Sequence, residues 1–115
     1  PALIVYTDDL PEDVGGRANG PYIRIRTKYV NDVGIHKHEL AHVAVFWLTL
    51  GLSIFLGALF KGFKIWNEAR AYRIQTQYPD RDGHYMTLDE AAERLASTHY
   101  GFGITVEQAM NVIEG

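Results

Sequence analysis

The 115-residue sequence predicts an α+β fold, in which a small N-terminal β-sheet is followed by about four helices. Residues 22–30 alternate apolar and basic side chains with the period of a β-strand. Residues 40–47 carry an apolar stripe with the period of a helix, and two capping boxes mark helices near the C-terminus. The length is typical of one domain. We expect residues 1–31 to form the sheet, 32–78 two helices and 79–115 the last two.

The first thirty residues contain the expected strands. Residues 2–6, ALIVY, are a short run rich in β-branched side chains. In residues 22–30, YIRIRTKYV, the isoleucines point to one face, whereas Tyr22 and the arginines point to the other. The residues between, 11–21, are rich in Gly and Pro and indicate turns. The sequence therefore predicts a hairpin, or two strands with a long connection.

The pattern then becomes helical. Asn31 or Asp32 can cap a helix that runs from about residue 33 to about 48. The apolar segment 49–63 contains several glycines, so we expect a bend there. A second helix is predicted for residues 64–78, and Pro79 is expected to end it.

The two C-terminal helices have clear beginnings. In a capping box, a Ser or Thr side chain accepts a bond from a backbone N–H three residues later, where a Glu or Gln side chain returns the bond. Thr87 with Glu90 and Thr105 with Gln108 both have this spacing. Each pair therefore predicts the start of a short helix.

Composition excludes several classes of function. The net charge of -3 and the isoelectric point of about 5.9 argue against a nucleic-acid partner, for which a basic surface is expected. The sequence has no cysteine, so a metal site must use His, Asp or Glu side chains. The absence of cysteine and of a recognisable signal peptide favours a cytoplasmic protein.

A long apolar segment raises the question of a membrane. From Leu40 to Phe60, no residue carries a formal charge apart from a protonated His42, and this length could span a bilayer. Polar residues and glycines interrupt the segment, so we expect it to be buried in a small core and do not expect a membrane partner. Residues 43–60 could also form an oligomer interface.

Three of the five histidines lie within residues 36–42, HKHELAH. His38, Glu39 and His42 form the pattern H-E-x-x-H on the predicted helix. Residues four apart are separated by about 40° around a helix axis, so His38 and His42 can bind one metal ion. Glu39 flanks the same face and can hold a water molecule. His36 lies about 200° from His38, so we expect it to face away from the metal.

Catalytic zinc needs a third protein ligand beside a water. Glu68, on the second predicted helix, follows His42 by 26 residues. If the chain bends within residues 49–63, the second helix can return antiparallel and bring Glu68 to the two imidazoles. The alternative is an exposed carboxylate that pairs with Lys64 or Tyr72.

These residues resemble a family of zinc metallopeptidases. H-E-x-x-H followed by a helix with N-E-x-x-A, here residues 67–71, is similar to the gluzincin branch. Small metallopeptidases encoded by phages and prophages look closer still, with a helix reading E-x-x-A-Y and an aromatic pair, here Phe46 and Trp47, after the second His. The resemblance covers about forty residues, from His36 to Gln75.

The resemblance implies a zincin-like fold, with Zn²⁺ bound by His38, His42 and Glu68. It also implies that Glu39 is the general base in the hydrolysis of a peptide or protein substrate. Residues 22–30 would then be a sheet edge along which the extended substrate lies. Larger gluzincins supply Tyr or His donors to the transition state from a second subdomain, and this chain is too short to contain one.

Tyr72 is the first candidate for such a donor, because it shares a helix face with Glu68. Further candidates are His84, Tyr85, His99 and Tyr100. The last two helices could instead cover the cleft in a latent form. Two other functions stay open. One is a non-catalytic zinc-binding structural or phage-assembly protein with the same fold, and the other is a membrane-associated metalloprotein anchored by residues 43–60.

Overall fold

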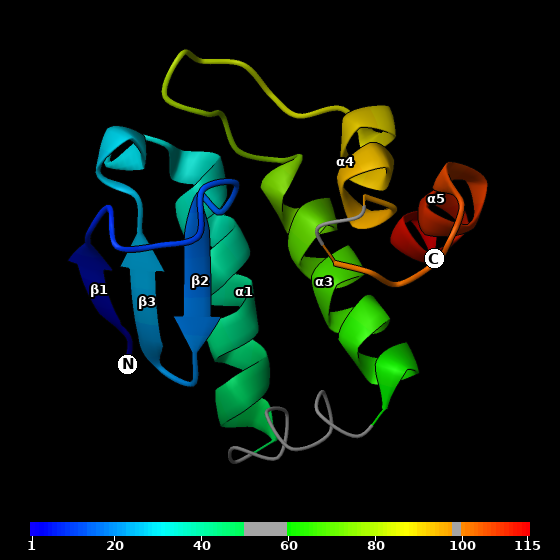
Figure 1. Cartoon of the computed structure of the whole chain (residues 1–115), viewed down its shortest axis with the longest axis horizontal. Coiled ribbons are helices and arrows are strands. Elements are labelled where there is room, and N and C mark those ends of the chain that lie inside the picture. Colours follow the sequence, from blue (N-terminus) through cyan, green and yellow to red (C-terminus); the bar gives the residue numbers. More distant parts are fainter. Residues whose placement is uncertain (50–59, 98–99) are drawn as a thin grey trace.

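The computed structural model describes residues 1–49, 60–97 and 100–115, and these form the α+β architecture that the sequence predicts (Figure 1). The sheet lies on one side, helices α1 and α3 run side by side through the middle, and α4 and α5 lie on the other side. Along the chain the described elements are β1 (Leu3–Tyr6), β2 (Gly16–Asn19), β3 (Tyr22–Ile25), the 3-10 helix η1 (Thr27–Tyr29), α1 (Val33–Leu48), α3 (Lys61–Gln75), α4 (Leu88–Leu95) and α5 (Val106–Glu114).

The sheet has the strand order β1-β3-β2, with β1 parallel and β2 antiparallel to β3. The prediction that residues 22–30 form an edge strand is therefore wrong: β3 ends at Ile25 and is the central strand. The missed strand is β2, which lies within the segment whose composition indicates turns. Its residues have low strand propensity, and pairing with β3 outweighs that local preference. Gly20, with a positive φ of 62°, allows the tight turn between β2 and β3.

One face of the sheet packs on α1. Ile23 and Ile25 are fully buried and form a cluster with Val43 of α1, as the alternation in the sequence predicts. Burial of three such side chains stabilises the fold by about 1.5–3 kcal/mol each. This contact fixes which face of α1 is turned away from the sheet, and therefore which of its side chains face α3.

Helix α1 has the bounds that the sequence predicts, and the Asp32 side chain caps it by accepting a bond from Ile35 N at 2.9 Å. Helix α3 begins and ends about three residues earlier than predicted. The two helices run antiparallel, as Figure 1 shows. The Arg70 side chain of α3 donates to the Ala41 carbonyl of α1 at 3.2 Å. The expected bend in residues 49–63 falls largely outside the described residues.

Helices α4 and α5 cover the other side of α3. Both predicted capping boxes are present, at Thr87 and at Thr105. Leu95 of α4 and Ile113 of α5 are fully buried in a cluster with Ala69 of α3. Within the parts of the chain that the structure describes, no helix is long and apolar enough to cross a membrane. Most of residues 43–60, the anchor of the membrane-associated alternative, lies outside those parts.

Candidate metal centre

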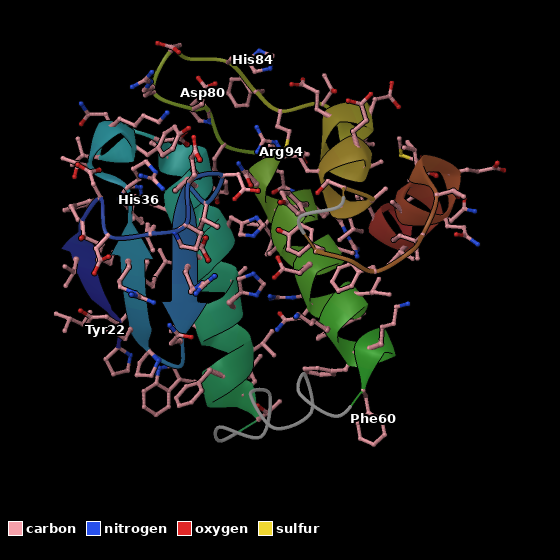
Figure 2. All side chains as sticks on the ribbon, viewed as in Figure 1. Tyr22, His36, Phe60, Asp80, His84 and Arg94 are labelled. Carbon is pink, nitrogen blue, oxygen red and sulfur yellow. The ribbon has the colours of Figure 1, made fainter. Side chains whose placement is uncertain are left out.

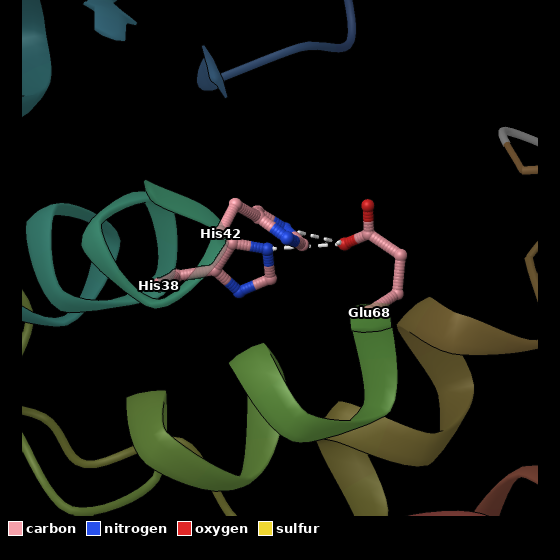
Figure 3. A group of neighbouring side chains, drawn as sticks. All are labelled: His38, His42 and Glu68. Carbon is pink, nitrogen blue, oxygen red and sulfur yellow. Dashed lines mark hydrogen bonds and ion pairs between the residues drawn. The ribbon is translucent and has the colours of Figure 1, made fainter. Parts of the chain in front are cut away.

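Three of the predicted side chains converge between α1 and α3 (Figure 3). Oε1 of Glu68 lies 3.2 Å from Nε2 of His38 and 3.1 Å from Nε2 of His42. Their ligand atoms all lie within 4.8 Å of one another, and no other group of metal-binding side chains is found among the described residues. The chain reversal therefore brings Glu68 to the imidazoles, and Glu68 is not the exposed carboxylate of the alternative interpretation.

Outer contacts orient His42. Its Nδ1 lies 3.0 Å from Oδ1 of Asn67, an acceptor, so Nδ1 carries a proton. Its Nε2 faces the carboxylate of Glu68, which also only accepts when it is ionised. Burial acts to lower the pKa of His42, but the bond and charge of Glu68 outweigh it and raise the pKa to about 9. In the metal-free protein His42 is therefore an imidazolium.

His38 lies deeper and has fewer partners. Its Nε2 donates to Glu68, and its ring meets the Tyr72 ring edge-on, with centroids 4.4 Å apart. Its Nδ1 is buried and has no hydrogen-bond partner among the described residues. This buried nitrogen is the one ring nitrogen of His38 that is not used toward Glu68.

Glu68 is the hub of the cluster. Its Oε1 accepts from both imidazoles and from the hydroxyl of Tyr100, at 3.3 Å. Burial acts to raise the pKa of Glu68, but the bonds from His38 and His42 outweigh it and hold the pKa well below its usual range. The carboxylate is therefore ionised at all ordinary pH values.

Glu39 lies beside this group, on the side of the sheet. It is buried, with 6% of its surface exposed, and its Oε2 would be 3.0 Å from a Cβ atom at Gly16 of β2. A glycine at this position lets the strand pass directly over the carboxylate. Burial raises the pKa of Glu39, while the charges of His38 and His42 act against this shift. A carboxylate with a raised pKa is a better proton acceptor than an exposed one.

Two tyrosines lie on the opposite side of the group. The hydroxyl of Tyr100 lies 2.6 Å from that of Tyr72. Tyr72 comes from α3, one turn after Glu68, whereas Tyr100 comes from the connection between α4 and α5. Burial raises the pKa of Tyr72 to about 12, and burial also raises the pKa of Tyr100. Both hydroxyls are therefore neutral.

The remaining candidates lie elsewhere. His36 faces away as expected: its Nδ1 donates to the Asp32 carbonyl at 2.7 Å, and its Nε2 accepts from Tyr6 at 2.9 Å. His84 is exposed on the loop between α3 and α4, where it pairs with Glu90 at 3.1 Å (Figure 2). Tyr85 is 55% exposed on the same loop. His99 lies outside the described residues.

A cleft of about 730 Å³ opens onto the group. It is lined by His38 and Glu39 of α1, by Gly16 of β2, and on the side of α3 by Tyr72 and Tyr100. The loop between α3 and α4 forms its outer part. This volume is in the range of sites that bind small molecules or several residues of a peptide.

The donor set suits Zn²⁺. Two imidazole nitrogens and one carboxylate oxygen form a usual ligand set of catalytic zinc, and bonds of about 2 Å in a tetrahedron place neighbouring ligand atoms roughly 3.3 Å apart. The two nitrogen–oxygen distances of 3.2 and 3.1 Å are close to this separation. In the metal-free protein, both imidazoles donate from Nε2 to the carboxylate oxygen that the cation would bind.

Comparison of the chain with models of protein families, with curated proteins and with solved structures found no match. Its function is therefore inferred from the geometry of the site.

Two contributors to the site have no assigned role at the sequence level. Asn67 lies in the N-E-x-x-A pattern, directly before the candidate ligand, and its contact with His42 could have been suspected from that position. Gly16 has no such signal, because its role depends on β2, a strand that the local sequence does not predict.

Proposed function

We propose that this chain is a zinc-dependent peptidase with a zincin-like fold. The observation that supports it best is the convergence of His38, His42 and Glu68, at a cleft that His38 and Glu39 line. His38, His42 and Glu68 would hold the ion, and Asn67 would orient His42. A zinc ion there would polarise a carbonyl group and lower the pKa of a water molecule.

Glu39 supplies the acid–base chemistry in this proposal. Its carboxylate removes a proton from the attacking water, whose oxygen forms a bond to the peptide carbonyl carbon. The bond from that carbon to the amide nitrogen then breaks, and Glu39 passes the proton to the leaving amine. Water and one peptide bond are consumed, and a carboxylic acid and an amine are formed.

The open edge of β2 can position the substrate. Arg26 N donates to Gly15 O at 2.8 Å, so these two residues form a hydrogen-bonded pair at the end of the β2–β3 ladder. Hydrogen-bonded and non-hydrogen-bonded pairs alternate along antiparallel strands, so the backbone groups of Gly16 and Ala18 point away from β3. Among the described strands only β3 pairs with β2. An extended peptide can therefore add to this edge, directly beside Glu39.

A Glu39→Gln variant tests the proposal. We expect the zinc-loaded wild type to cleave denatured casein or a mixture of fluorescence-quenched peptides. The variant should keep one zinc per chain and lose activity by about 10²–10⁴-fold, the usual contribution of a general base. Glu114→Gln, at an exposed position on α5, is the matched control and should change neither.

Two outcomes would contradict the proposal. A purified chain that takes up less than half an equivalent of zinc would exclude the metal site. A chain that binds zinc but cleaves none of these substrates would favour the non-catalytic zinc-binding alternative.

A further inference from the structure

The ring of Tyr100 is held firmly by the C-terminal helices. It stacks on Phe102, with ring centroids 5.2 Å apart and the planes 9° from parallel. Phe102 is buried in the cluster that contains Leu95 of α4 and Ile113 of α5. The position of the Tyr100 hydroxyl therefore depends on the packing of these two helices against α3.

The direction of the hydrogen bonds can be derived from the acceptors. The carboxylate of Glu68 cannot donate, so the Tyr100 hydroxyl donates its proton to Glu68 Oε1. The 2.6 Å bond between the two hydroxyls must then be donated by Tyr72 to the Tyr100 oxygen. The proton of Tyr72 therefore goes to Tyr100, and the proton of Tyr100 goes to Glu68 Oε1, the oxygen that also faces both imidazoles.

The two sides of the cleft differ in chemistry. Glu39 and Gly16 lie on the side of the sheet, and Tyr72 and Tyr100 lie on the side of α3 and α4. As Figure 1 shows, the sheet and the α4–α5 pair flank the α1 and α3 helices. A carbonyl group placed between these sides has a proton acceptor on one side and a hydroxyl donor on the other.

We propose that α4 and α5 complete the site, by supplying the Tyr100 hydroxyl as the donor to the substrate carbonyl oxygen as negative charge develops on it. This inference rests on the proposed function. Tyr72 is the positioning residue, because its own proton holds the Tyr100 oxygen in place. A prearranged neutral donor stabilises such charge more than water does, because it needs no reorientation during the reaction.

This role is the opposite of the latent form that the sequence leaves open. If the C-terminal helices only cover the site, removal of the Tyr100 hydroxyl should open it and strengthen the binding of ligands. If Tyr100 is the donor, the same change should weaken the binding of any ligand that places an oxygen at the metal.

A binding experiment separates these roles without a substrate. The protein is loaded with Co²⁺ and titrated with acetohydroxamate, and the visible absorption of the cobalt reports binding. We expect Tyr100→Phe to weaken binding by about tenfold or more, since a hydrogen bond to a charged group contributes about 1.5–3 kcal/mol. Tyr85→Phe, on the exposed loop, is the matched control and should bind as the wild type does. Unchanged or tighter binding by Tyr100→Phe would overturn the inference.

Kinetics then test the positioning role. In zinc-loaded protein we expect Tyr100→Phe to lower kcat by about 10²–10³-fold, as loss of one such donor does elsewhere, with KM changed little. Tyr72→Phe should lower kcat by a smaller factor, again with KM and zinc content retained. Equal kcat in the wild type and in Tyr100→Phe would show that Tyr100 is not the donor to the carbonyl oxygen. A wild type without turnover would instead count against the proposed function. The cobalt titration would still test whether Tyr100 donates to an oxygen of the bound ligand.

Discussion

Nδ1 of His42 lies 3.0 Å from Oδ1 of Asn67, the residue directly before Glu68. A ligand and the residue that orients its partner are thus neighbours on α3. Removal of such an outer partner usually lowers metal affinity by about 10–100-fold. We expect this loss for Asn67→Ala, measured by competition with a zinc chelator. Asn111→Ala, at an exposed position on α5, should have no effect, and equal affinity of both variants would contradict the role of Asn67.

The pair His42 and Glu68 makes the stability of the metal-free protein depend on pH. The pKa of His42 is raised from 6.5 to about 9, so its contribution is fully present below pH 6.5 and is lost as pH rises through about 9. The pKa of Glu68 is lowered from 4.5, so its contribution is present above pH 4.5 and is lost as pH falls. We therefore expect the highest Tm between about pH 4.5 and 6.5.

Calorimetry in the presence of a chelator measures this profile. The decline of Tm between pH 6.5 and 9 should be smaller in His42→Gln, whereas His84→Gln, which changes an exposed histidine, should keep it. With zinc bound, Tm should instead rise between pH 6.5 and 9, because the ion competes with the protons on the imidazoles. Binding at pH 7 should release about one proton per chain, and zinc binding without proton release would show that His42 is neutral in the metal-free protein.

Gly16 limits the space above Glu39. A Cβ atom there would lie 3.0 Å from Glu39 Oε2, closer than such contacts normally are. We expect Gly16→Ala to shift the Glu39 carboxylate and to lower kcat by at least tenfold, while zinc affinity stays within about twofold, because the change lies outside the ligand set. Gly62→Ala is the control, since nothing lies within 4 Å of the added atom. A Gly16→Ala enzyme with normal kcat would show that the position of Glu39 is not restricted by the strand.

The edge of β2 gives a prediction for amide hydrogen exchange. The N–H groups of Gly16 and Ala18 point away from β3, so they should exchange rapidly in the free protein. A bound peptide hydroxamate, such as N-acetylated trialanine hydroxamate, should slow both by about tenfold or more if it adds as a strand. The N–H of Arg17, which faces β3, should be protected in both states. Exchange at Gly16 and Ala18 that the ligand does not change would place the substrate elsewhere.

The sequence by itself determined the elements whose signals are local. The bounds of α1, its cap at Asp32 and the two capping boxes follow from hydrogen bonds between residues three or four positions apart. The same locality placed His38 and His42 on one face and turned His36 away. These features need no contact with a distant part of the chain.

Tertiary structure decided what depends on distant partners. Strand β2 forms in a turn-like segment because β3 pairs with it, and β3 is central because β1 pairs on its other side. The 3.1 Å approach of Glu68 to His42 depends on the packing of α1 against α3. The sequence offered Tyr100 only as one of several candidates. Its place beside Glu68 is fixed by the burial of Phe102 between helices, and burial is a property of the whole fold, because it is shared by residues far apart in the chain.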